Sequence, residues 1–109
     1  MVIDKLLKQN IIQKIWRYRQ ILENAGLPVE SLIIFGSQAK GIAKEWSDID
    51  LCVVSKRFGK DRHDERIFLM RYIDNQSLDI EPHPYNPNDL KDRWDPLAAE
   101  IRKYGITVT

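Results

Sequence analysis

Cysteine is almost absent from this sequence, and two familiar phosphate-binding motifs are missing altogether. The 109 residues include one cysteine, Cys52, which excludes an internal disulfide and a cysteine-based zinc site. Cys52 lies in an apolar run and is expected to be a small buried residue rather than a nucleophile. The sequence contains neither the Gly-Lys-Ser/Thr of a Walker loop nor the G-x-G-x-x-G fingerprint of dinucleotide-binding folds.

Long apolar runs and a strong charge of one sign are missing too. No segment approaches the roughly 20 apolar residues that cross a bilayer, and the first ten residues lack the apolar core of a secretion signal. The formal net charge is +1, which gives no support to specific nucleic-acid binding. We therefore expect a cytoplasmic protein that binds neither a membrane nor a specific nucleic acid.

The remaining composition is that of a globular protein. Apolar residues make up 43% of the chain and charged residues 30%, which excludes a disordered protein. A chain of 109 residues can build one hydrophobic core but not two. Because no repeat, linker or low-complexity stretch interrupts it, we expect one domain over residues 1–109.

The first segment has the periodicity of a helix. Its apolar residues recur at spacings of three and four, which predicts one buried face made of Leu7, Ile11, Ile15, Tyr18 and Leu22. The lysines of this helix are expected to form a solvated face. Gly26 and Pro28 end the helix.

Two apolar runs and one alternating stretch predict strands. The runs cover residues 31–35 and 47–54, and residues 77–85 alternate between apolar and polar side chains. Pro82 cannot donate a backbone hydrogen bond, so the third strand either ends there or lies at an edge of the sheet. Residues 106–109 form either a closing strand or a tail.

Capping residues predict the remaining helices. A short helix follows Gly36, with Ser37 as its N-cap and Gly41 at its end. Asn86 and Asp95, each followed by proline, cap two of the other helices. These helices are predicted over 62–75, 86–94 and 95–105. The order of elements predicts an α/β (α+β) domain with a small sheet.

Asp48 and Asp50 require an explanation. Two positions apart on a strand, they point to the same side, and their carboxylates repel each other unless a cation lies between them. Mg²⁺ prefers such oxygen ligands. Asp79, on the polar face of the third strand, adds a third carboxylate if the two strands are neighbours. Three carboxylates can hold the two metal ions that serve phosphoryl and nucleotidyl transfer.

The Gly36-Ser37 pair fits the same chemistry. Gly36 lets the backbone approach a ligand, and Ser37 starts a helix whose free N–H groups attract an anion. Phosphates are therefore expected at this pair. Glu81 and His83 share the face of Asp79: Glu81 is expected to be a solvated strand residue or a fourth carboxylate. His83, between two prolines, is expected to belong to a rigid turn rather than to a metal site.

These motifs resemble one known superfamily. The residues "GSQAKG…WSDIDL" are similar to the signature of the polymerase-β-like nucleotidyltransferases, in which a strand, Gly-Ser and a short helix precede a D-x-D strand. The small size resembles the minimal nucleotidyltransferases, which include antitoxins encoded beside HEPN-domain ribonuclease toxins. The resemblance implies a small mixed sheet flanked by helices.

The resemblance also implies a role for each matching residue. Asp48, Asp50 and Asp79 would be catalytic and bind Mg²⁺, two ions in all. The nucleotide would be bound by Gly36, Ser37, Lys40 and Ser47. Many relatives carry arginine where this chain has Lys40, which binds phosphate as a point charge. The reaction would move AMP from ATP to a tyrosine hydroxyl of a HEPN toxin, in a complex with that partner.

Two alternatives remain open. The chain could neutralise a toxin by covering it, without catalysis. It could instead modify a small molecule such as an aminoglycoside, with a partner subunit supplying the pocket. Three tryptophans, Trp16, Trp46 and Trp94, either cover the core or anchor a partner interface.

Overall fold

The computed structural model describes residues 8–44 and 46–109. Helices and strands alternate through most of this part of the chain. In order they are α1 (Gln9–Asn24), β1 (Ser31–Phe35), α2 (Ser37–Lys40), β2 (Ile49–Val54), α3 (Arg62–Met70), β3 (Ile80–Tyr85), the 3₁₀ helix η1 (Asp89–Lys91), α4 (Pro96–Tyr104) and β4 (Ile106–Thr107).

The strands form one mixed sheet in the order β3-β2-β1-β4. β1 runs antiparallel to both β2 and β4, whereas β2 and β3 are parallel. This arrangement confirms the expected α/β (α+β) class with a small mixed sheet. β3 lies at an edge, the position predicted from Pro82, and the residues after Gly105 form a closing strand rather than a tail.

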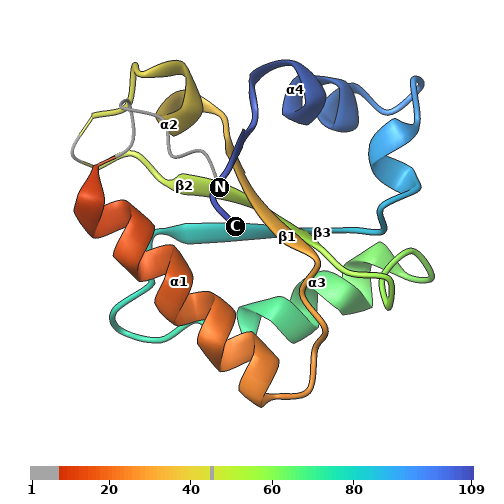
Figure 1. Ribbon diagram of the computed structural model, residues 1–109, viewed down its shortest axis with the longest axis horizontal. Helices are drawn as coiled ribbons and strands as arrows, with labels where there is room; N and C mark the ends of the chain where they lie inside the picture. Colours follow the sequence, from red (N-terminus) through yellow and green to blue (C-terminus); the bar gives the residue numbers. More distant parts are fainter. Residues whose placement is uncertain (1–7, 45) are drawn as a thin grey trace.

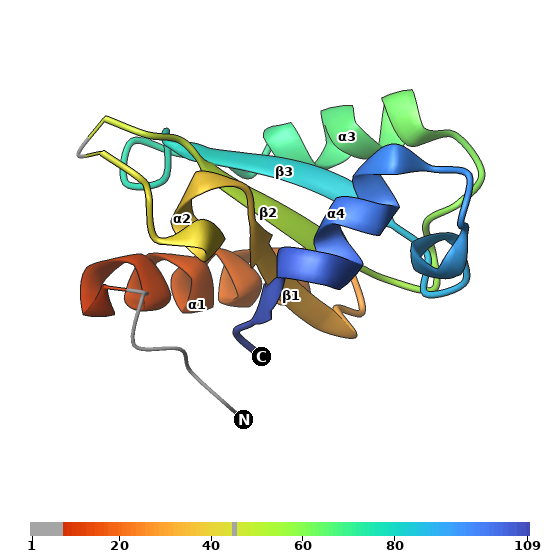
Figure 2. The ribbon, with the colours of Figure 1, turned by 90° about the horizontal axis from the view of Figure 1, so that it is seen from above.

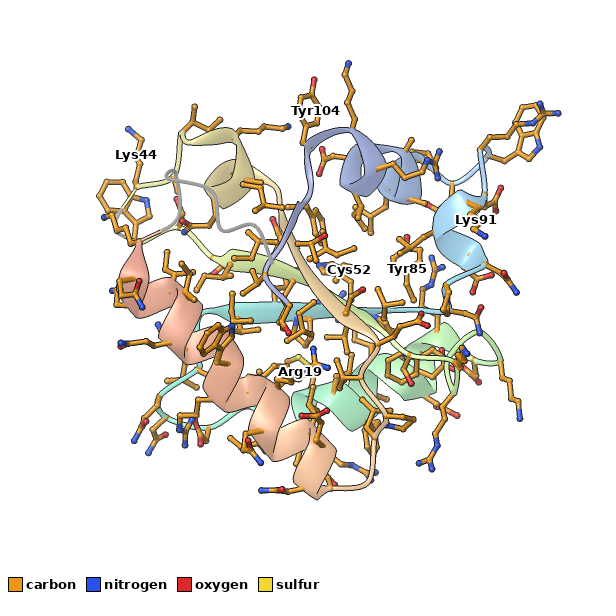
Figure 3. The ribbon with its side chains drawn as sticks, in the orientation of Figure 1. Arg19, Lys44, Cys52, Tyr85, Lys91 and Tyr104 are labelled. Atoms are coloured by element: carbon orange, nitrogen blue, oxygen red, sulfur yellow. The ribbon has the colours of Figure 1, made fainter. Side chains whose placement is uncertain are left out.

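Helices cover both faces of the sheet (Figure 1). α1 and α3 lie on one face, where Ile49, Leu51 and Val53 of β2 join the larger apolar cluster. α4 crosses the other face, as Figure 2 shows from above. There Cys52 and Tyr85 pack in the smaller cluster, and Figure 3 shows both between the sheet and α4. Cys52 is buried, as expected.

The apolar face of α1 faces the core as predicted. Ile11, Ile15, Tyr18 and Leu22 are buried, whereas Leu7 lies outside the described residues. The Tyr18 hydroxyl donates a 2.7 Å hydrogen bond to the carbonyl of Leu69 in α3, which ties the two helices together. Among the helices of the described part, none is both long and apolar enough to span a membrane.

The helix predicted over 86–94 is wrong in extent. Only Asp89–Lys91 is helical there, as a single 3₁₀ turn, and its N-cap is Asn88 rather than Asn86. The Asn86 side-chain amide instead donates a 2.9 Å hydrogen bond to the carbonyl of Phe58, in the loop after β2. Asp95 does cap α4, accepting from the N–H groups of Leu97 and Ala98.

Candidate functional site

Two parallel strands bring Asp50 and Glu81 side by side. Asp50 of β2 is in register with Glu81 of β3, so both side chains point to the same face. This is the face of Cys52 and α4, because residues alternate along a strand. One ligand atom from each of Asp50, Glu81 and His83 lies within 4.8 Å of the others. We call these three residues the carboxylate–histidine cluster.

The charge of this cluster is carried by Asp50, Glu81 and the neighbouring Asp48. Asp48 precedes β2 and is exposed. Burial, and then the negative charges of Glu81, Asp48 and Glu100, raise the pKa of Asp50 to about 6. Carboxylates crowded in this way favour the presence of a cation. Asp48, Asp50 and Glu81 each supply carboxylate oxygens, so these residues fit a hard divalent ion such as Mg²⁺.

The structure does not place the Asp79 carboxylate in the cluster, contrary to the predicted convergence of Asp79 with Asp48 and Asp50. The Asp79 carboxylate accepts hydrogen bonds from Lys14 Nζ of α1 at 2.8 and 2.9 Å, and it is not a member of the cluster. Its carbonyl accepts from the Ile49 N–H at 2.7 Å, where the pairing of β2 and β3 begins. Asp79 therefore borders the site while its carboxylate is neutralised by a lysine.

Gly36 lies directly against the Asp50 carboxylate. It has a φ of 72° and is the N-cap of α2, so Ser37 is the first helical residue and not the cap that was predicted. A Cβ atom at position 36 would be 2.2 Å from Asp50 Oδ2. The glycine is thus required by the packing of a catalytic candidate, and this contact places the start of α2 beside the cluster.

Lys40 and Ser47 lie on different sides of α2. The Lys40 ammonium lies 3.6 Å from a Glu100 carboxylate oxygen and 4.8 Å from the centre of the Tyr104 ring, so it is directed to α4. The Ser47 hydroxyl accepts a 2.8 Å hydrogen bond from the Lys44 N–H and lines a cleft beside α2. Of these two predicted nucleotide ligands, Ser47 lines this cleft, whereas Lys40 is directed to α4.

This cleft, of about 350 Å³, is bordered by α1, α2 and the loop before β2. Three lysines line it, which makes it suited to an anionic ligand. They are Lys8, Lys14 and Lys44, and Figure 3 shows Lys44 on the loop that follows α2. Sequence reasoning assigned the helix lysines to a solvated face. The available signal was the spacing of Lys14 three residues after Ile11, which puts both on one side of α1.

His83 belongs to the site, contrary to the prediction of a rigid turn. It lies within β3, its side chain is 16% exposed, and its Nε2 is 3.7 Å from Asp50 Oδ1. Burial lowers the pKa of His83 below its usual value, which keeps the imidazole neutral near pH 7. The alternation of Asp79, Glu81 and His83 was the signal for this placement, and the flanking prolines obscured it.

One arginine and several apolar side chains surround Glu81. Arg66 of α3 lies 3.3 Å from a Glu81 carboxylate oxygen. A second cavity, of about 260 Å³, is lined by charged and apolar side chains together: Asp48, Arg66, Asp79 and Glu81 with Met70, Leu78 and Ile80. Leu78 is 73% exposed, an unusual position for leucine beside a charged site. One side of the site is thus basic and the other partly apolar.

Comparisons with known proteins point to one class. Residues 12–107 match a family model described as a nucleotidyltransferase domain. A candidate protein adenylyltransferase of Methanocaldococcus jannaschii is 32% identical over 91 residues, which cover 80% of this chain and 60% of that protein. The chain therefore spans less than two thirds of the length of that curated relative.

Two solved structures share the fold. A candidate nucleotidyltransferase from Sulfolobus solfataricus superposes with a TM-score of 0.57 at 22% identity, over 92% of this chain and 86% of that chain. A toxin–antitoxin structure with AMP-PNP superposes with a TM-score of 0.58 at 20% identity, over 90% and 72%. Both likenesses establish the polymerase-β-like fold of the chain.

Proposed function

Because the chain belongs to the nucleotidyltransferase domain family, we propose that it transfers AMP from ATP to a hydroxyl group of a partner protein. One observation carries the proposal: the carboxylates of Asp50 and Glu81 meet beside Gly36 at the start of α2. A nucleotidyltransferase needs its metal-binding carboxylates next to its phosphate site, and this pair of contacts provides that proximity.

Asp48, Asp50 and Glu81 would hold Mg²⁺, two ions by the resemblance described above. When bound, the metal supplies positive charge to the triphosphate and lowers the pKa of the attacking hydroxyl. The cleft bordered by α1 and α2 offers Lys8 and Lys44 to the remaining phosphate charge, since Lys14 is paired with Asp79. Ser37 and Ser47 add hydroxyl groups at the start of α2 and at the rim of the cleft.

The transfer replaces a phosphoanhydride bond of ATP with a phosphoester bond to the acceptor. The acceptor oxygen forms a bond to the α-phosphorus of ATP, the bond from that phosphorus to the bridging oxygen breaks, and pyrophosphate leaves. The proton of the acceptor hydroxyl passes to a carboxylate. We assign this role to Glu81, because its carboxylate lies in the cluster with Asp50, whereas the Asp79 carboxylate is held by Lys14.

The assignment replaces Asp79 with Glu81 as the third catalytic carboxylate. Glu81→Gln is expected to lower the rate of AMP transfer at least about 100-fold, the scale of a lost general base. Asp79→Asn is expected to lower it less than about tenfold, because Asp79 is bound to Lys14. Initial rates with ATP labelled on the α-phosphate measure both. The reverse order of effects would return the role to Asp79.

The acceptor is proposed to be a tyrosine of a HEPN ribonuclease toxin. A solved neighbour is a toxin–antitoxin complex, and the family resemblance implies this acceptor. Exposed Trp46 and Ile42 next to the cleft, and Leu78 beside Glu81, are the apolar contacts that a protein partner needs. The resulting AMP–tyrosine would silence the toxin.

The experiment incubates the purified protein with Mg²⁺ and α-labelled ATP in a lysate of the source cell. A labelled protein band that the Asp48→Asn, Asp50→Asn double variant fails to produce supports the proposal, and its mass identifies the acceptor. Release of label into small molecules only would favour the aminoglycoside-type alternative. A partner that co-purifies without label would favour a non-catalytic antitoxin.

Binding of Mg²⁺ is expected to weaken in acid. Asp50, with its pKa raised to about 6, is ionised at pH 7.5 and mostly protonated at pH 5. Protonation removes the charge that attracts the ion, so the apparent affinity should fall about tenfold between these pH values. Calorimetric titration with Mg²⁺ measures the change. In the Asp50→Asn variant the binding should be weaker and should vary less over this range.

A further inference from the structure

His83 is the one member of the carboxylate–histidine cluster for which the proposed transfer has no use. Its Nε2 is buried and makes no hydrogen bond within the described residues, which is unusual for a buried polar atom. The same nitrogen faces Asp50 Oδ1 at 3.7 Å. A buried nitrogen aimed at a carboxylate, without a hydrogen-bond partner, calls for a ligand.

The ring is held in this direction by its surroundings. It packs edge-on against Phe35, with ring centres 5.1 Å apart and planes inclined by 62°. Pro82 and Pro84 on either side restrict the backbone of β3. The imidazole therefore presents Nε2 to the cluster without needing a rotamer change.

The spacing suits a single ion. Ligands at about 2.1 Å from an octahedral ion lie about 3.0 Å apart when adjacent and about 4.2 Å apart when opposite. The ligand atoms of Asp50, Glu81 and His83 lie within 4.8 Å of one another, and His83 Nε2 is 3.7 Å from Asp50 Oδ1, so the three side chains need to close somewhat to reach one ion. Arg66 contacts one oxygen of Glu81, and the carboxylate has a second.

We propose that His83 is a third ligand, with Asp50 and Glu81, and makes this site prefer Mn²⁺ and related transition-metal ions to Mg²⁺. The inference rests on the proposed function, which places a divalent ion at this cluster. Mg²⁺ favours an all-oxygen environment, whereas an imidazole nitrogen raises the affinity for first-row transition metals. A site of two carboxylates and one imidazole therefore distinguishes the two kinds of ion.

The alternative role for His83 is to orient Asp50 through a hydrogen bond. The two roles give different results when the imidazole is removed. Loss of a ligand weakens Mn²⁺ binding and leaves Mg²⁺ binding nearly unchanged, because Mg²⁺ gains little from nitrogen. Loss of a positioning hydrogen bond weakens both ions alike, because both use Asp50.

The test measures ion binding to the purified protein, independently of any acceptor. The electron paramagnetic resonance signal of free Mn²⁺ reports bound Mn²⁺, and competition reports Mg²⁺. Wild type is expected to prefer Mn²⁺ at least about tenfold. His83→Ala and His83→Gln should both lose about 10-fold to 100-fold in Mn²⁺ affinity and less than about threefold in Mg²⁺ affinity. Circular dichroism identifies a variant that fails to fold. If one of the two His83 variants does so, the ion affinities of the other variant provide the test.

Three results separate the inference from the function on which it rests. Equal losses for both ions, or no loss for Mn²⁺, overturn the ligand role of His83 and leave the proposed function standing. Mn²⁺ and Mg²⁺ binding that is insensitive to Glu81→Gln and to Asp50→Asn contradicts both proposals, since the ion then lies elsewhere. A selective loss of Mn²⁺ binding establishes His83 as a ligand even if no acceptor is labelled.

Discussion

Replacing Asp50 with asparagine is expected to stabilise the metal-free protein while abolishing AMP transfer. Burial and three neighbouring carboxylates raise the pKa of Asp50 from 3.8 to about 6. The folded state therefore binds the Asp50 proton more tightly than the unfolded chain does, and stability falls as the pH rises from about 4 to about 6. Asparagine has no charge to bury, so the gain above pH 6 should be about 1–3 kcal/mol.

Denaturant unfolding at pH 8 with a chelator measures this gain, and label transfer in Mg²⁺ measures activity. The activity should fall at least about 100-fold, because the ion loses a ligand. Glu30→Gln is the matched control, because it removes one negative charge at an exposed position and should change stability by less than about 0.5 kcal/mol. At pH 4.5 the gain from Asp50→Asn should largely disappear. A destabilised Asp50→Asn protein at pH 8 would contradict the argument.

Gly36→Ala is expected to cost about 2–5 kcal/mol of stability and most of the activity. The new Cβ would lie 2.2 Å from Asp50 Oδ2, so either α2 or the Asp50 carboxylate must move. The left-handed φ of 72° contributes about 1–2 kcal/mol, and the forced shift about 1–3 kcal/mol. Thermal and denaturant unfolding measure the first effect, and label transfer the second.

Gly26→Ala separates the two contributions. Gly26 also has a positive φ, of 94°, but a Cβ added there would have no atom within 4 Å, so only the backbone strain is expected. The double variant Gly36→Ala, Asp50→Ala should recover the part of the loss that arises from the clash. Equal losses at Gly26 and Gly36, with no recovery in the double variant, would show that Asp50 does not constrain position 36.

The first half of the site could be predicted from the sequence because its parts are close together in the chain. Gly36 ends a strand, Asp50 lies at the start of the next, and an antiparallel hairpin of β1 and β2 brings them together. Local signals such as an apolar run, a glycine and a short helix are enough to describe such a unit. The buried face of α1 followed from the same kind of periodic pattern.

The third carboxylate could not be chosen in this way. The alternation predicts Asp79, Glu81 and His83 on one face, but β3 starts only at Ile80, and its register against β2 decides which of them lies beside Asp50. A shift of two residues would exchange Glu81 for Asp79 without moving any apolar residue to the wrong side. Asp79 pairs with Lys14, which is 65 residues away in the chain, and no local sequence pattern predicts that contact.

The prolines of β3 have a consequence for how the protein meets other chains. The carbonyls of Asp79 and Tyr85 accept from the N–H groups of Ile49 and Ser55, so alternate residues of the strand face β2. The backbone groups of the intervening residues, which include Pro82 and Pro84, point away from β2 toward the open edge. Proline has no N–H, so these two positions offer no donor to an added strand. β4, at the opposite edge, is only two residues long. Both edges thus disfavour the addition of a strand, and we expect a partner to be recognised mainly through side chains.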